Sequence, residues 1–509
     1  MIKLLDAVNG FVWGVPGLLL ILSVGILLSI RTGWVQLRMF PAALKAFLLS
    51  LRKSDNKGVS SYKALCTALA ATVGTGNLAG VAGAIALGGP GAVFWMWICA
   101  FLGMATKFAE AALSVRYRIK GEDGTYMGGP MYIVRQGMGR KWQPLAGIYC
   151  FFGVVAAFGV GSATQINTVL GGINGAVRSL GGQESDFVNL MIGIALAILL
   201  VLVLLGGAKR IGSAAAFLVP FASLFYILLC IGVLVLRAKA IPDAFAAIVT
   251  GAFDPEAVTG GVIGSIFISL RVGACRGVFT NEAGMGTAGI AHASAEVSHP
   301  VKQGLMGIME VFIDTIVICT MTALAILCSG ISIPYGQDLG IQITANAFSG
   351  IYGSWVHIPL AFTLCCLAFA TIIGWGLYGT RCAQFLFGEA AWRKFVFLQA
   401  GSVILGAVLS TGTVWSLSEI ANGLMAIPNL IILLYFSPEL VKLTVNYKNL
   451  IGTNVATGGT YEDFYQCKPL RTLSNAKVPP TGGKSKGGWQ KDLPSEYRPA
   501  RHSHPGSIL

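Results

Sequence analysis

The chain has 509 residues, of which 55% are hydrophobic and only 11% are charged, and its formal net charge is +14. A soluble protein of this length would need several domains with almost no charge on their surfaces, so the composition excludes a soluble protein and indicates a membrane protein. The positive charge does not indicate nucleic-acid binding, because the Lys and Arg residues are concentrated in every second loop between apolar runs.

Apolar runs long enough to cross a membrane recur along the whole chain. A membrane-spanning helix needs about 20 apolar residues. The sequence predicts eleven such spans, which gives an all-α membrane protein. Their approximate ranges are 13–30, 61–86, 91–115, 145–170, 187–205, 213–236, 258–292, 303–328, 357–379, 394–410 and 413–436.

The basic residues between these spans predict the orientation in the membrane. Segments that face the cytoplasm carry an excess of Lys and Arg. This rule places the N-terminus outside and the C-terminus inside. Outward segments then hold only Lys3, Arg178, Arg237 and Lys239, whereas inward segments hold Arg31, Arg38, Lys45, Arg52, Lys53, Lys57, Arg116, Arg118, Lys120, Arg135, Arg140, Lys141, Lys209, Arg210, Lys302, Arg381, Arg393 and Lys394.

The spans divide the chain into five segments. Residues 1–30 form an additional N-terminal transmembrane helix. Residues 31–60 are a cytoplasmic amphipathic connector, which either lies flat on the membrane surface or is an ordinary linker. Residues 61–237 and 238–437 are two repeats of five helices, and residues 438–509 are a basic cytoplasmic tail that we expect to be largely disordered.

Two spans have helix-weakening residues in their middle. One is interrupted between residues 74 and 80, and the other between residues 273 and 286. In lipid, a broken helix is tolerated only where its freed backbone groups face protein, water or a ligand. Each break falls in the first helix of a five-helix half, and this pattern predicts inverted repeats with a binding site at the middle of the membrane.

Such a break can bind an amino acid together with a cation. The half-helix after the break presents N–H groups to a carboxylate, and the half-helix before it presents carbonyls to an ammonium group or to Na⁺. Thr75 and Asn77 add polar side chains to the first break, and Phe279 stands where its ring can close over a small solute at the second. Gly76 and Gly80 could instead be a helix-packing pair, but packing does not explain Thr75 and Asn77.

Other polar residues inside the spans have two readings. Gln165, Thr371 and Trp375 either contact a solute or serve in helix packing and interhelical hydrogen bonds. Lys107 and Glu110 are three residues apart on one helical face and are expected to pair with each other. Glu310 and Asp314 are four residues apart. They either carry a proton or a cation, or are satisfied by Arg271, Arg276 or a helix end. No nucleophile and base are placed for hydrolysis, so we do not expect an enzyme.

Four runs of residues are similar to the signature sequences of the alanine or glycine:cation symporter family. They are residues 72–81 (TVGTGNLAGV), 88–97 (GGPGAVFWMW), 103–110 (GMATKFAE) and 281–288 (NEAGMGTA). The similarity covers roughly residues 18–438. It implies a LeuT-like fold of 5+5 inverted repeats with one additional N-terminal helix.

The same resemblance implies sodium-coupled import of small neutral amino acids, such as alanine and glycine, across the bacterial inner membrane. Na⁺ is then the coupling ion, the amino acid and the lipid bilayer are the partners, and no nucleic acid or obligate protein partner is expected. The implied substrate contacts are Thr75, Gly76, Asn77, Gln165, Phe279, Thr371 and Trp375, and the implied Na⁺ contacts are the carbonyls around Ala71 and Gly74 and the Thr371 hydroxyl. The residues leave open a proton-coupled symporter of the same fold and, less directly, a channel or a receptor.

Overall fold

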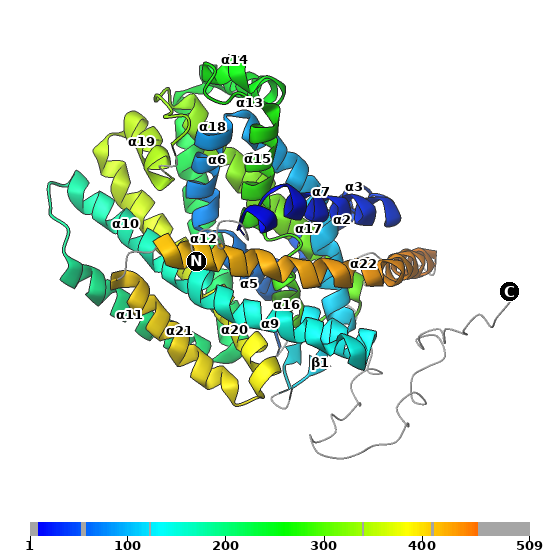
Figure 1. The fold of residues 1–509 in the computed structure, drawn as a ribbon. Helices are drawn as coiled ribbons and strands as arrows, with labels where there is room; N and C mark the ends of the chain where they lie inside the picture. Colours follow the sequence, from blue (N-terminus) through cyan, green and yellow to red (C-terminus); the bar gives the residue numbers. More distant parts are fainter. Residues whose placement is uncertain (1–8, 52–57, 122–123, 338–339, 409–411, 457–509) are drawn as a thin grey trace, which may run out of the picture. The chain divides into compact units, whose positions relative to one another are not determined.

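The computed structural model describes the backbone of residues 9–51, 58–121, 124–337, 340–408 and 412–456, and their side chains except those of residues 412–419 and 451–456. The described part is almost entirely helical (Figure 1). Residues 457–509, most of the predicted tail, lie outside it.

The secondary structure follows the predicted all-α pattern. The first half contains α2 (Val15–Arg31), α3 (Val35–Arg38), α4 (Phe40–Ser50), α5 (Ser61–Thr72), α6 (Val81–Gly88), α7 (Gly91–Arg116), β1 (Ile119–Lys120), β2 (Tyr126–Met127), α8 (Pro130–Ile133), α9 (Gln143–Phe158), α10 (Thr164–Ser179), α11 (Asp186–Leu204) and α12 (Gly207–Leu236). The second half contains α13 (Ile241–Phe253), α14 (Pro255–Thr259), α15 (Ile266–Asn281), α16 (Thr287–Ala293), α17 (Pro300–Val311), α18 (Thr320–Cys328), α19 (Ile341–Tyr352), α20 (His357–Phe387), α21 (Ala391–Val408) and α22 (Gly412–Ala456). The two strands pair antiparallel, Ile119 with Met127.

Eight described helical segments are long and apolar enough to cross a membrane, or nine if the bent pair α5–α6 counts as one span. This confirms a multi-pass helical membrane protein. The two other predicted spans correspond to α15, which has only 16 residues, and α21, which begins near the charged residues Arg393 and Lys394. The predicted number of eleven spans is therefore not reached by length and hydropathy alone.

The first predicted break is present. Helix α5 ends at Thr72, a π-helical turn η1 (Gly76–Gly80) follows, and the axis bends by 52° between the two halves of the span. Three glycines within seven residues weaken the helix here, because glycine loses more conformational freedom on ordering than any other residue.

The second break is shorter than predicted. Helix α15 runs without interruption to Asn281, and only residues 282–286 leave the helix, with φ values of 54° at Glu282, 101° at Gly284 and 80° at Gly286. The helical conformation of residues 273–281 corrects the prediction. Gly273 serves close packing instead, since a Cβ there would lie 2.2 Å from the carbonyl oxygen of Ala92 on α7.

Two further spans are interrupted where the sequence predicts continuous helices. The π-helical turn η4 (Gly159–Ala163) separates α9 from α10, and η6 (Phe312–Cys319) separates α17 from α18. Short π-helical segments inside α-helices are frequent at functional sites.

The connector and the tail differ in part from their predictions. Helix α4 lies in the predicted connector; it buries Ala43 and Ala46 against the protein and leaves Leu44 and Leu48 exposed. Helix α22 continues past Pro438, where the tail was predicted to begin. Packing overrides the proline, because residues beyond it (Leu440, Leu443 and Tyr447) are buried.

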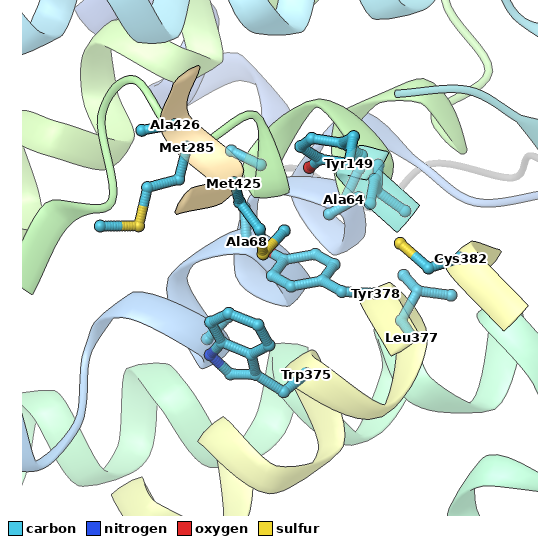
Figure 2. Packing of buried hydrophobic residues seen from close by; sticks show 14 of the residues in the cluster. Ala64, Ala68, Tyr149, Met285, Trp375, Leu377, Tyr378, Cys382, Met425 and Ala426 are labelled. Atoms are coloured by element: carbon cyan, nitrogen blue, oxygen red, sulfur yellow. The ribbon is translucent and has the colours of Figure 1, made fainter. Parts of the chain in front are cut away.

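Helix α20 packs closely on the first half of the broken helix. Figure 2 shows Tyr378 of α20 beside Ala68 of α5, with Trp375 on one side of it and Met425 of α22 nearby. The small side chains of α5 allow this approach: a Cβ on Gly374 would lie 2.8 Å from the backbone nitrogen of Ala71. The arrangement brings α20 against the end of α5, where the break begins.

The two broken helices also meet away from the breaks. Val59, just before α5, forms a parallel bridge with Ala295, just after α16, and the Glu296 N–H donates to the Val59 carbonyl at 2.8 Å. Arg118 clamps the same segment by donating to the carbonyls of Ala293 at 3.2 Å, Ala295, and Val297 at 3.4 Å. Burial lowers the pKa of Arg118 to about 10.

Candidate functional site

The first break and η6 meet at the side chain of Asn77. Its Oδ1 accepts a hydrogen bond from the Gly74 N–H at 2.8 Å, which replaces a bond lost from the broken helix. Its Nδ2 donates to Asp314 Oδ1 at 2.8 Å and to the Asp314 carbonyl at 3.1 Å. Asn77 and Asp314 are fully buried, so this amide holds the unwound turn against a carboxylate in the protein interior.

A second predicted residue reaches the break from α10. Gln165 lies just after the turn η4 and donates from Nε2 to the Val160 carbonyl at 3.0 Å. Its Oε1 accepts a hydrogen bond from the Thr75 hydroxyl at 3.4 Å. The structure therefore brings Thr75 and Gln165 together, although 90 residues separate them in the sequence.

Thr371 of α20 also lies against the end of α5, close to Gly74. A Cβ on Gly74 would stand 2.6 Å from Thr371 Oγ1, so only glycine fits at position 74 without a shift of the hydroxyl. The last carbonyls of an α-helix have no partner inside the helix, and these belong here to the turn that contains Ala71. Hydroxyl and carbonyl oxygens are the ligands that hard cations prefer. The predicted cation contacts are thus neighbours in the structure.

Trp375 forms a wall of the same region. Its side chain is fully buried and packs on the turn η4, where a Cβ on Gly161 would lie 2.4 Å from Trp375 Cβ. Its ring also contacts Tyr378 edge to face, with centroids 5.7 Å apart. Among the described residues, Trp375 Nε1 has no hydrogen-bond partner.

Phe279 is not brought to the first break with the other six predicted substrate contacts. It lies in the regular part of α15 and packs edge to face on Trp13, with ring centroids 6.1 Å apart. The next residue, Thr280, faces the break instead, and its Oγ1 lies 3.4 Å from the position of a Cβ on Gly76. Successive residues of a helix point about 100° apart, so Phe279 and Thr280 cannot both face Gly76.

A chain of hydrogen bonds connects the two broken helices through η6. Asn281, the last residue of α15, donates from Nδ2 to Thr315 Oγ1 at 3.2 Å. The Thr315 hydroxyl donates to Asp314 Oδ2 at 2.8 Å, and Asp314 accepts from Asn77. The sequence assigned no role to Thr315 or Asn281. Asp314 was visible as a carboxylate in an apolar segment, which is a functional signal in membrane proteins.

Lys107 pairs with Glu310 and not, as predicted, with Glu110. Lys107 Nζ lies 2.8 Å from Glu310 Oε1, and both side chains are fully buried. His292 Nε2 lies 2.9 Å from the other carboxylate oxygen of Glu310. The partners of Glu310 are thus Lys107 and His292, and the expected partners Arg271 and Arg276 are replaced. A shared helical face was the wrong criterion, because Glu310 on the neighbouring helix α17 lies within hydrogen-bond distance of Lys107, whereas Glu110 bonds to the second break and to Asn429.

Glu110 instead holds the second break. Its Oε1 accepts hydrogen bonds from the backbone N–H groups of Gly284 at 2.9 Å and Gly286 at 3.0 Å, and from Asn429 Nδ2 at 2.8 Å. Each break therefore has a buried carboxylate beside it, Asp314 at the first and Glu110 at the second.

The region around the first break is closed to solvent in this conformation. Thr75 is 8% exposed, Gln165 6% and Thr371 3%. The described residues contain no group of three or more His, Cys, Asp or Glu side chains that could hold a metal ion. The polar groups that the structure places at the first break are backbone N–H and carbonyl groups, side-chain amides, hydroxyls and the Asp314 carboxylate.

Known proteins share this sequence and fold. A model of the sodium:alanine symporter family matches residues 1–456. The sodium/alanine symporter AgcS of Methanococcus maripaludis is 41% identical over 457 residues, which cover 88% of this chain and 98% of AgcS. The amino-acid carrier protein AlsT of Bacillus subtilis is 36% identical, with 87% of this chain and 92% of AlsT covered.

A further relative carries a different substrate in its name. The probable sodium/glutamine symporter GlnT of Bacillus subtilis is 35% identical, with 84% of this chain and 87% of GlnT covered. Among solved structures, the crystal structure of MhsT in complex with L-phenylalanine matches with a TM-score of 0.55 at 14% identity, over 75% of this chain and 90% of MhsT. This likeness shows a shared LeuT-like fold.

Proposed function

The chain belongs to the sodium:alanine symporter family, and we propose that it couples the entry of Na⁺ to the import of small neutral amino acids such as alanine and glycine. A negative interior contributes about 2.3 kcal/mol per charge per 100 mV, so a cation that moves inward can drive the uptake of a solute without net charge. The names of the relatives AgcS and AlsT support a sodium-coupled amino-acid carrier.

The proposed substrate site lies at the first break. The N–H groups that follow the break suit a carboxylate, because the start of a half-helix carries partial positive charge. Thr75, Gly76, Asn77, Gln165 and Thr371 surround this point. Trp375 would limit the length of the side chain of the bound amino acid. We leave Phe279 out of the site because it packs on Trp13.

The proposed Na⁺ site lies between the end of α5 and α20. The carbonyls around Ala71 and Gly74 and the Thr371 hydroxyl offer oxygen ligands, and Thr371 Oγ1 approaches Gly74 closely. Asp314 adds a buried negative charge near the same break through its bond to Asn77. A buried carboxylate without a nearby cation is unfavourable, and this favours binding of Na⁺ in the region.

The proposed topology has eleven spans, with the N-terminus outside and the C-terminus inside a bacterial inner membrane. It adds α15 and α21 to the nine apolar spans. Both helices pack inside the bundle, α15 against α7 and α21 against α11 and α20, so neither depends on lipid contact along its whole surface. The bundle that contains the two broken helices, one from each repeat (residues 61–237 and 238–437), would rock against the remaining helices for alternating access.

The observation that carries the proposal is the position of Asn77, which bridges the broken backbone and Asp314. We expect Asn77→Ala and Gln165→Ala to abolish Na⁺-dependent alanine uptake into proteoliposomes, because each removes an amide from the closed site. Asn346→Ala and Gln342→Ala make the same changes at exposed positions of α19 and serve as matched controls. Normal uptake by both site variants would refute the assignment.

Replacement of Na⁺ by choline separates the sodium-coupled reading from its rival. The second candidate is a proton-coupled symporter, in which the buried carboxylates Glu310 and Asp314 would carry the proton. Sodium coupling predicts that accumulation of alanine stops in choline at constant pH, whereas proton coupling predicts that it continues.

A further inference from the structure

The two oxygens of the Glu110 carboxyl group have different surroundings. Oε1 accepts three hydrogen bonds, from Gly284 N, Gly286 N and Asn429 Nδ2. Oε2 is buried and has no hydrogen-bond partner among the described residues. An ionised carboxylate can accept at both oxygens, whereas a carboxylic acid accepts at one and donates from the other. The distribution of donors around Glu110 is that of an acid.

Asn429, which donates to Glu110, also carries a buried acceptor without a partner among the described residues. Asn429 uses both hydrogens of Nδ2, toward Glu110 Oε1 and the Gly284 carbonyl, each at 2.8 Å. Its Oδ1 has no hydrogen-bond partner among the residues that the structure describes. The oxygen and nitrogen of one amide lie side by side, as do the two oxygens of one carboxyl group. One proton on Glu110 Oε2 can therefore satisfy both unpaired oxygens at once.

The charge balance around the second break requires that some of its buried acids bind a proton or a cation. Four carboxylates in this region are at most 3% exposed, namely Glu110, Glu282, Glu310 and Asp314. Among the described residues that contact them, the cation is Lys107, which pairs with Glu310. The ring of His292 contacts the other oxygen of the same Glu310. An uncompensated charge costs several kcal/mol in a protein interior, so some of these acids must bind a proton or a cation.

The hydrogen bonds distinguish Glu110 within this group, because its Oε2 is the one carboxyl oxygen of the four acids that is buried without a partner among the described residues. Glu282 accepts at Oε2 from the Thr287 hydroxyl at 2.6 Å. Glu310 has a donor at each oxygen, from Lys107 and from His292. Asp314 also has a donor at each oxygen, from Asn77 and from Thr315. Glu110 lacks a donor at Oε2, and the amide that bonds to its Oε1 carries an unpaired acceptor, Asn429 Oδ1.

We propose that Glu110 is a neutral carboxylic acid in the folded protein and that its Oε2 hydroxyl donates to Asn429 Oδ1. The resulting cyclic acid–amide pair joins α7 to α22 and leaves Oε1 to hold the N–H groups of Gly284 and Gly286. Glu110 is thus a positioning residue for the second break, and it performs this role without a buried charge. The inference concerns the proton at one atom and does not depend on which solute the protein carries.

Infrared spectroscopy of the purified protein in a detergent without ester groups tests the proton directly. We expect a carbonyl stretching band of a protonated carboxylic acid at neutral pH, which shifts in D₂O and is missing from the Glu110→Gln variant. Asn429→Ala should shift the same band, because it removes the hydrogen-bond acceptor of the acid. This second variant keeps the test open if Glu110→Gln does not fold.

The matched control is the same substitution at Glu310. Glutamine reproduces every hydrogen bond of a protonated Glu110, so Glu110→Gln should retain uptake within about threefold of the wild type. Glu310→Gln removes the charge that Lys107 needs and should reduce uptake at least about tenfold. Glu110→Asp should also reduce uptake, because the shorter side chain cannot reach both Asn429 and the N–H groups of Gly284 and Gly286.

Absence of the acid band in the wild-type protein, or loss of uptake in a folded Glu110→Gln variant, would overturn the proposal. If a cation instead of a proton lay between Glu110 Oε2 and Asn429 Oδ1, the acid band would be absent and the Glu110→Gln variant would lose uptake. The infrared result stands even if the protein does not transport alanine, so a failure of the proposed function would be distinguishable from a failure of this inference.

Discussion

At the scale of single residues, the contact between Gly74 and Thr371 defines the proposed Na⁺ site. The hydroxyl reaches the broken end of α5 only because residue 74 has no side chain. The Thr371 hydroxyl also donates to the Leu367 carbonyl at 3.1 Å, which fixes its orientation and leaves its lone pairs free to face a cation.

We expect Thr371→Val to raise the Na⁺ concentration at which uptake is half-saturated. Valine has nearly the same shape but no ligand oxygen, and a lost bond to a charged group costs about 1.5–3 kcal/mol, which is roughly ten-fold or more in the half-saturating Na⁺ concentration. Thr363→Val is the control, since Thr363 is also buried on α20 and bonds to the carbonyl four residues earlier. An unchanged Na⁺ dependence in Thr371→Val would remove the residue from the site.

Sequence analysis predicted most of the residues at the first break but not their partners. Thr75, Asn77, Gln165 and Thr371 stand out because polar side chains are costly in apolar spans. The pairing of Lys107 with Glu310 could not be predicted, because it depends on how α17 packs against α7 and not on spacing along one helix. The side on which Phe279 lies depends on the rotation of α15, and periodicity does not define it in a helix that is buried on most sides.

At the scale of the elements, interruptions and caps determine where the polar groups meet. The glycines at 74, 76 and 80 predicted the first break, whereas η6 contains no glycine or proline and could not be predicted from helix-weakening residues. The second break was predicted too early, because glycines that weaken a helix and glycines that allow close packing look the same in a sequence.

The start of α17 provides a prediction about pH. His299 caps this helix, and its Nδ1 accepts from the Val301 N–H at 3.2 Å, which requires an unprotonated nitrogen. Burial, together with Lys302 and Arg116 nearby, lowers the pKa of His299 to about 4. Because the pKa is lower in the folded state, the unfolded state binds the proton first as the pH falls. Stability should therefore be constant above about pH 7 and decrease between about pH 6.5 and 4, by at most about 3 kcal/mol from this group.

Thermal unfolding of the solubilised protein at a series of pH values measures this decrease. Asparagine is a good N-cap that does not titrate, so His299→Asn should retain stability at neutral pH and flatten the acid side of the profile. A profile of His299→Asn as steep as that of the wild type would show that other groups cause the loss.

At the scale of the whole molecule, the arrangement of basic loops predicts the orientation. Ser185 and Lys141 are both exposed and lie in successive loops, between α10 and α11 and just before α9. With the N-terminus outside, Ser185→Cys should react with an impermeant thiol reagent on intact cells, and Lys141→Cys only after the cells are permeabilised. The reverse labelling pattern would show that the orientation in the membrane is opposite to the predicted one.

The class of fold was predictable from the sequence because hydropathy and charge act over whole spans. The all-helical membrane architecture and the break in α5 needed only apolar length and glycine position. The lengths of α15 and α22 were not predictable in the same way, because they depend on packing against neighbouring helices. Helix α15 is short for a membrane span, and α22 continues past Pro438.

The bridge between Val59 and Ala295 has a mechanical consequence. It attaches the beginning of one interrupted helix to the end of the other through a single peptide hydrogen bond, from Glu296 to Val59. One hydrogen bond contributes only about 0.5–1.5 kcal/mol, so packing between α5 and α16 supplies the rest of the attachment. Arg118, just after α7, holds the segment after α16 through three carbonyls, and α16 also packs on α7. If the two interrupted helices separate on this side, we therefore expect α5 to move and the end of α16 to remain with α7.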